Sequence, residues 1–211
     1  MGARKLLVVD LEATCWARGE HVQEHMETIE ICALLVDPAG EAPRREFQCF
    51  VRPTRFPTLS EFCTQLTSIR QEDVQRASLF GPAFSAFLAW LGEPREVRFA
   101  SWGDYDRRQL VRDCQLAGIA YPFCGDTINL KHVCCPKLGM KPGGMAQALA
   151  RAGLPLDGAH HRALDDARNI LRIAERAFEG RLELLMASPP SLPPELRPRP
   201  GRPSAGSPPS T

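Results

Sequence analysis

The sequence has no excess of charge of either sign. Its 26 lysine and arginine residues balance 25 aspartate and glutamate residues and leave a formal net charge of +1. A balanced chain has no general attraction for nucleic acids, membrane surfaces or acidic ligands. Binding to any of these must therefore depend on particular residues.

None of the eight cysteines is spaced as C-x-x-C, and most of them lie within apolar stretches. The N-terminal apolar run at 6–9 is too short to cross a membrane and lacks the small-residue pattern of a cleaved leader. We therefore expect reduced, buried thiols in a cytoplasmic protein. Cys134 and Cys135 beside His132 are a poor metal site, because adjacent cysteines rarely both reach one ion and a fourth ligand is missing.

The composition divides the chain into one domain and a tail. With 211 residues, 44% of them hydrophobic, the chain can build one packed core, which we place at residues 4–182. Residues 187–211 are rich in proline, serine and arginine and are expected to be disordered, because this composition cannot bury a core. Such a tail can adopt extended conformations that other domains bind, so it is a candidate contact for a protein partner.

Strands come first in the predicted order of elements, and helices dominate later. Apolar runs predict strands at 6–9, 29–36, 47–51 and 97–100, of which the first three suggest an antiparallel meander. Helical patterns and their capping residues predict helices at 60–66, 71–75, 82–91, 104–117, 145–152 and 161–178. This mixture indicates an α/β fold.

Two acidic residues stand two positions apart at the end of the first predicted strand. Side chains with this spacing share a face, so the carboxylates of Asp10 and Glu12 would repel each other unless a cation compensates them. A hard divalent ion such as Mg²⁺ or Mn²⁺ supplies that charge. The alternative is that one of the two acids merely faces solvent at the strand end.

A second pair of acids stands where the strand at 97–100 gives way to a helix. Asp104 precedes the helix and is a candidate N-cap, whereas Asp106 falls near its apolar stripe. We therefore assign capping to Asp104 and chemistry to Asp106.

A third group opens the last long helix. The apolar stripe of this helix puts Asp165 and Asn169 on the opposite, solvated face. Asp166 falls at the border of the stripe, where it can reach a site at the edge of the domain. His161 precedes it by about one turn.

Taken in order, Asp10-x-Glu12, Asp106 and His161-x4-Asp166 resemble the motifs of the DEDDh exonucleases of the DnaQ-like, RNase T superfamily. The DEDDy subtype has a tyrosine four residues before the last acid, and Arg162 stands there. Four segments are similar to the subgroup of histone-mRNA 3′ exonucleases and Eri-type exoribonucleases, namely 9–15, 59–67, 101–103 and 161–169. The resemblance implies an RNase H-like exonuclease fold, in which helices flank a mixed sheet with an antiparallel meander and parallel strands.

The resemblance also implies an activity: hydrolysis of single-stranded RNA, or of a short 3′ overhang, from the 3′ end to nucleoside 5′-monophosphates. Two ions, Mg²⁺ or Mn²⁺, would be held by the four carboxylates of Asp10, Glu12, Asp106 and Asp166. His161 would be the general base for the attacking water, because a histidine can be neutral at working pH and still accept a proton.

For the substrate, the resemblance implies that Phe62 and Tyr105 sandwich the terminal base. The backbone at Glu12 and Ala13 would approach the 3′ hydroxyl, with His161 beside it. Thr67 is a weaker candidate for the pocket wall. Phe62 is equally compatible with a place in the core.

Two alternatives stay open. The same residues serve exonucleases of single-stranded DNA, and a non-catalytic nucleic-acid-binding or regulatory protein can keep this fold. The second alternative would be favoured by loss of one acid or of the histidine, and all five are present.

Overall fold

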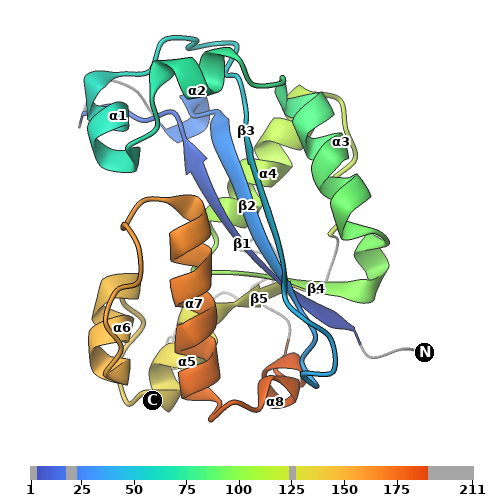
Figure 1. Ribbon diagram of the computed structural model, residues 1–211, viewed down its shortest axis with the longest axis vertical. Coiled ribbons are helices and arrows are strands. Elements are labelled where there is room, and N and C mark those ends of the chain that lie inside the picture. The colour runs from blue at the N-terminus through green and yellow to red at the C-terminus, as the bar shows by residue number, and fades with distance from the viewer. Residues whose placement is uncertain (1–3, 18–22, 124–126, 190–211) are drawn as a thin grey trace, which may run out of the picture.

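The computed structural model describes residues 4–17, 23–123 and 127–189 of the chain (Figure 1). Of the tail predicted at 187–211, all but the first three residues lie outside these ranges, and so do its predicted disorder and partner contact. No helix in the described ranges is long and apolar enough to cross a membrane.

A five-stranded mixed sheet forms the centre of the domain, with the strand order β3-β2-β1-β4-β5. The three strands β1, β2 and β3 pair in antiparallel fashion, whereas β4 pairs in parallel with β1 and with β5. The bounds are β1 Lys5–Ala13, β2 Thr28–Val36, β3 Arg45–Phe50, β4 Val97–Ser101 and β5 Thr127–Asn129. The predicted α/β fold and its antiparallel meander are confirmed, while β5, with three residues, was too short for the sequence pattern to indicate.

Helices cover both faces of the sheet (Figure 1). The helices are α1 Glu61–Thr67, α2 Gln71–Gln75, α3 Phe80–Leu91, α4 Tyr105–Leu116, α5 Leu130–Lys137, α6 Met145–Ala152, α7 Ala163–Ala177 and α8 Leu182–Met186, with short 3₁₀ turns at Gln23–His25 and Pro94–Glu96. All six predicted helices are present. The sequence did not indicate α5, which contains Pro136, or the five-residue α8.

Alternate residues of β1 supply two separate cores. Leu6 and Val8 pack with α5, α6, α7 and α8 on one face, and Leu7 and Val9 pack with α3 and α4 on the other. All four side chains are fully buried. Because both faces are covered, β1 is held at the centre of the molecule, and residues at its end take fixed positions. The helices α1 and α2 lie beyond that end, at the top of the view (Figure 1).

The start of α7 differs from the prediction in two ways. The helix begins at Ala163 instead of His161, because His161 has a φ of 63° and Arg162 is the N-cap. The solvated position predicted for Asn169 is wrong: its side chain is fully buried, because the preceding loop covers this face of the helix. Its Nδ2 donates to the Asp157 carbonyl at 2.8 Å, and the Asp157 N–H donates to its Oδ1 at 3.1 Å.

The same loop is closed by a glycine. Gly158 has a φ of 75°, and a Cβ placed there would lie 2.3 Å from the Asp165 Cγ. Asp165 in turn accepts the Ala159 N–H at 3.0 Å. A side chain at position 158 would therefore have to displace the Asp165 carboxylate, which holds the loop that carries His160 and His161.

We predict that Gly158→Ala lowers the free energy of unfolding by about 1–3 kcal/mol, the combined cost of a strained backbone and a displaced carboxylate. Gly40→Ala is the matched control, since Gly40 has a nearly equal φ of 74° with open space around it. The measurement is urea unfolding followed by circular dichroism. Equal losses in the two variants would show that the contact with Asp165 contributes nothing.

Candidate active site

A cleft of about 410 Å³ at the end of β1 brings the predicted catalytic residues together. It is lined by Asp10, Glu12, Asp106, His161 and Asp166, and also by Ala13 and Tyr105. These residues come from β1, from the first turn of α4 and from the start of α7, which are far apart in the sequence.

The two acids of β1 lie on the face of the strand that packs against α7. Carboxylate oxygens of Asp10, Glu12 and Asp166 all lie within 4.8 Å of one another. Glu12 and Asp166 are only 8% and 5% exposed. Three carboxylates in so small a volume are the donor set that hard divalent cations prefer in proteins.

Asp106 reaches the same cleft from the other side of β1. It is buried in the first turn of α4, and its Oδ1 accepts the Leu11 N–H at 3.1 Å, which fixes α4 to the end of the strand. Asp104 takes the predicted N-cap position, but its side chain makes no capping hydrogen bond. The position was therefore predicted correctly and the bond was not.

The electrostatics of the cleft favour a bound cation. Burial raises the pKa of Asp10 well above its ordinary value, and the charges of Asp106, Glu12 and Asp166 raise it further. Burial, followed by the charge of Glu30, raises the pKa of Glu12 to about 9. Burial also raises the pKa of Asp106 to about 7. The residues therefore fit divalent metal ions, which would compensate the charge that these carboxylates otherwise resist carrying.

His161 lines the cleft and is partly buried. Its backbone N–H donates to Asp166 Oδ2 at 3.0 Å, which ties its position to that of the carboxylate. Partial burial, and then the proximity of His160, lower the pKa of His161 below its ordinary value. A neutral imidazole at neutral pH is the form that can accept a proton.

Sequence reasoning missed a second histidine beside it. His160 Nδ1 lies 3.1 Å from both carboxylate oxygens of Asp166. The rings of His160 and His161 are stacked, with centroids 4.0 Å apart and an angle of 12° between their planes. The signal in the sequence was the adjacent pair of histidines.

Glu30 was also missed. It is fully buried and lies directly opposite Glu12 in the pairing of β1 with β2. Its Oε1 accepts a hydrogen bond from Gln48 Nε2 at 2.6 Å and lies 3.7 Å from the Arg162 guanidinium. A single acid within the otherwise apolar run of β2 was the signal.

The structure brings only some of the predicted substrate-binding residues to the cleft. Ala13 and Tyr105 line it, and the Tyr105 hydroxyl lies 3.5 Å from Met26 Sδ. Phe62 is 42% exposed and lies outside the lining, one turn before Leu66, which takes the place in the wall. Met26 and Trp102 also line the cleft and were not predicted as wall residues.

Thr67 lies behind the wall. It is fully buried, and its hydroxyl donates to the Cys63 carbonyl at 2.9 Å. This bond ties the side chain to its own helix, and Thr67 is not among the residues that line the cleft.

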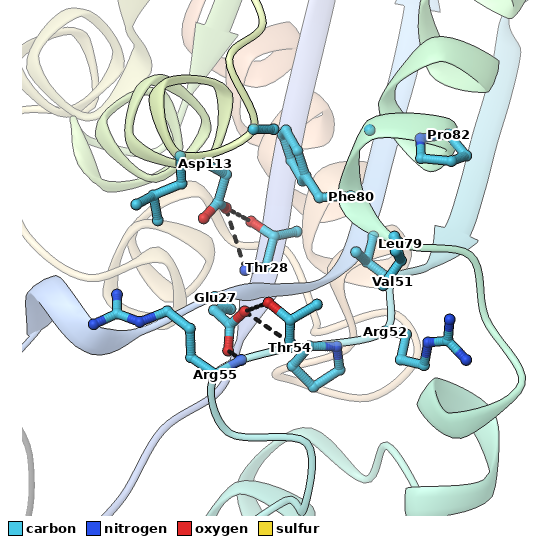
Figure 2. Close-up of a pocket in the computed structure, with 14 residues that line it drawn as sticks. Glu27, Thr28, Val51, Arg52, Thr54, Arg55, Leu79, Phe80, Pro82 and Asp113 are labelled. Carbon is cyan, nitrogen blue, oxygen red and sulfur yellow. Dashed lines mark hydrogen bonds between the residues drawn. The ribbon is translucent and has the colours of Figure 1, made fainter.

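A second cavity of about 490 Å³ lies near the start of β2 and also contains two acids (Figure 2). Glu27 accepts the backbone N–H groups of Thr54, Arg55 and Phe56 at 2.8–3.0 Å. Asp113 accepts the Thr28 hydroxyl at 2.6 Å. Glu27 holds the loop at 54–56 beside the start of β2, and Asp113 holds α4 to Thr28. Because both carboxylates are occupied in this way, these acids serve the fold, and the chemistry belongs to the cleft at the end of β1.

The raised pKa values predict a dependence of stability on pH. Between about pH 5 and pH 9 the metal-free folded chain retains a proton on Glu12 that the unfolded chain releases, so the free energy of unfolding falls as the pH rises. We expect Glu12→Gln to reduce this fall by more than about 1 kcal/mol, because the amide does not titrate.

The measurement is urea unfolding in a chelator at pH 5.5 and pH 8.5, repeated with added Mg²⁺ or Mn²⁺. The ion should stabilise the unaltered chain more than the variant at pH 8.5, because it binds the carboxylate form. A pH dependence identical in the two proteins would contradict the assignment of the titrating group to Glu12.

Known proteins with similar sequences include exoribonucleases. The chain is 32% identical over 191 residues to ERI1 exoribonuclease 2 of Mus musculus, a match that covers 80% of this chain and 28% of the mouse protein. It is 30% identical over 217 residues to 3'-5' exoribonuclease 1 of Homo sapiens, with coverages of 94% and 62%. The chain thus spans less than two thirds of either relative.

A solved structure matches over nearly its whole length. The nuclease domain of 3'hExo, a DEDDh family member bound to rAMP, superimposes with a TM-score of 0.76 at 28% identity, covering 84% of this chain and 92% of that domain. The model of the exonuclease family RNase T matches residues 7–174, a range that includes every carboxylate of the cleft. The chain belongs to the RNase T family of exonucleases and, as its DEDDh relatives indicate, to the branch near the histone-mRNA exonucleases.

Proposed function

We propose that this chain is a metal-dependent 3′-to-5′ exoribonuclease that shortens single-stranded RNA, or a short 3′ overhang, and releases nucleoside 5′-monophosphates. The observation that carries the proposal is the convergence of Asp10, Glu12, Asp106 and Asp166 with His161 in one cleft. The relatives named exoribonucleases support RNA as the substrate, and the related domain bound to rAMP supports a nucleotide as the product.

The carboxylates have distinct parts in this proposal. Asp10, Glu12 and Asp166 would hold one divalent ion, and Asp106 would reach a second ion shared with Asp10, either Mg²⁺ or Mn²⁺ in both places. When bound, such ions stabilise charge on the attacking and leaving oxygens of the phosphodiester. The Leu11 N–H keeps one oxygen of Asp106 oriented, so that the other oxygen is available to the cleft.

His161 would take the proton of the attacking water. Its lowered pKa keeps the imidazole neutral at neutral pH, and its backbone bond to Asp166 holds it beside the acidic group. The rate should therefore rise with pH as His161 loses its proton and should level off below the ordinary histidine pKa of about 6.5.

Selection of a chain end would come from the shape of the cleft. A volume of about 410 Å³ suits one terminal nucleotide, and the wall around it offers apolar and aromatic contacts from Leu66, Met26 and Tyr105. The backbone at Glu12 and Ala13 would face the 3′ hydroxyl. Phe62 would close over the terminal base from the rim, since it is exposed one helical turn from Leu66.

The proposed exonuclease domain comprises residues 4–186. This is four residues beyond the limit predicted from composition, because Leu185 is fully buried in the core on the α7 side. A cytoplasmic location is proposed from the sequence, and the seven cysteines within the described ranges are free thiols.

The activity is tested with two 5′-labelled 20-mers of equal sequence, one of RNA and one of DNA. We expect a ladder that shortens from the 3′ end, faster on RNA, lost in chelator and lost in Asp166→Asn. Asp37→Asn is the matched control, because Asp37 accepts a bond within the turn after β2, far from the cleft, and asparagine can keep that bond. Faster decay of DNA would favour a DNA exonuclease, and binding without cleavage would favour a regulatory protein.

A separate prediction concerns His161. We expect His161→Ala to lower kcat by about 10²–10⁴-fold, the usual contribution of a general base, while the Mn²⁺ affinity changes little. Calorimetric titration with Mn²⁺ and single-turnover cleavage measure the two effects. A loss of metal affinity as large as the loss of rate would show that His161 acts through the metal site instead.

A further inference from the structure

His160 has no part in the proposed reaction, yet it lies against one of its carboxylates. Metal-ligand atoms of His160, His161 and Asp166 all lie within 4.8 Å of one another. This cluster shares only Asp166 with the carboxylate group formed by Asp10, Glu12 and Asp166. The chain therefore contains two overlapping sets of potential metal ligands with different chemistry.

We propose that His160, His161 and Asp166 form a Zn²⁺ site, and that Zn²⁺ bound there inhibits the exonuclease. The binding is a property of the cluster alone. The inhibition rests on the proposed function, because it requires that His161 and Asp166 take part in turnover.

The donor atoms select the ion. Two imidazole nitrogens and one carboxylate oxygen suit Zn²⁺, which binds both atom types and commonly takes three protein ligands and a water. Mg²⁺ prefers oxygen ligands alone and keeps several waters, so it favours the carboxylate group. Zn²⁺ also binds nitrogen-containing sites more tightly than Mn²⁺ does.

The distances are close to those that Zn²⁺ requires. Bonds of about 2.0–2.2 Å in a tetrahedron place neighbouring ligand atoms about 3.4 Å apart. His160 Nδ1 and Asp166 are 3.1 Å apart, so one edge of the tetrahedron already has this length. All three ligand atoms lie within 4.8 Å of one another, and rotation of the His160 side chain, which is 38% exposed, can bring them to the tetrahedral spacing.

The backbone holds the cluster in place. The His161 N–H donates to Asp166, and the loop before it is fastened to α7 through Asn169 and Asp165. The backbone of all three ligands is therefore fixed before an ion binds, and only side-chain rotation is lost on binding. The two imidazole rings are stacked with an angle of 12° between their planes, and an ion bound to a ring nitrogen lies near the plane of its ring, so the partly exposed His160 ring would turn out of the stack to share an ion with His161.

Occupation of this site would compete with the proposed chemistry in two ways. Asp166 cannot serve both clusters without sharing its oxygens, and a histidine nitrogen bound to Zn²⁺ has no lone pair left for a proton. Zn²⁺ would therefore withdraw the general base and one metal ligand together.

The test measures Zn²⁺ binding directly, by competition with a chromophoric chelator on the full-length chain freed of metal. We expect one tight site in the unaltered chain and at least about tenfold weaker binding in His160→Gln and in His160→Asn. His132→Gln is the matched control, because His132 lies on α5 outside the cluster, and it should bind as the unaltered chain does. Circular dichroism confirms that each variant is folded.

Equal Zn²⁺ affinity in the folded His160 variants and the unaltered chain would overturn the proposal, since it would place the ion on the carboxylates alone. Absence of a tight site in the unaltered chain would overturn it as well.

A second arm titrates Zn²⁺ into the RNA assay at fixed Mg²⁺, with each protein normalised to its own rate without Zn²⁺. His160→Gln should need at least about tenfold more Zn²⁺ for half inhibition. Equal inhibition of both proteins would overturn the inhibitory role. An unaltered chain that lacks nuclease activity without Zn²⁺ would instead refute the proposed function, while the binding arm would still decide the site.

Discussion

Carboxylates that repel one another are held together at the end of β1, and the packing around them must outweigh that repulsion. Asp10 and Glu12 share a face of a strand buried between two cores, so neither can turn away without pulling apolar neighbours from their packing. Asp106 and Asp166 approach from helices on opposite faces of the sheet. A site of this kind is stable only when protonated or when loaded with cations, which couples folding, pH and metal binding in one group of residues.

The polar bonds around the cleft serve mainly to limit this repulsion and to fix orientation. The Leu11 N–H stabilises the charged form of Asp106, and the His161 N–H does the same for Asp166. Glu30 acts in the opposite sense, because its charge raises the pKa of Glu12 from across the strand pair. Burial raises the pKa of Glu30 itself, and the hydrogen bond from Gln48 and the charge of Arg162 offset only part of that rise. The balance between these groups sets how strongly the cleft attracts a cation.

The sequence was most informative where a short spacing and a regular element coincide. Asp10 and Glu12 could be placed on one face because strands alternate, and Asp106 could be separated from Asp104 because helices have a fixed period. Asn169 was misplaced by the same period, because the loop that buries it comes from outside the helix. Phe62 and Leu66 share one side of α1, so periodicity could not decide which of them enters the wall. Only the docking of α1 on the end of the sheet settles that position.

The left-handed backbone at His161 has a consequence for evolution of the site. A side chain at a φ of 63° costs roughly 1 kcal/mol or more relative to glycine, although histidine tolerates this region better than most residues. Glycine would relax the turn and remove the imidazole in a single step. Selection for stability and selection for turnover therefore oppose each other at this one position. Once catalysis is no longer required, a change to glycine, which yields a more stable and inactive protein, is favoured.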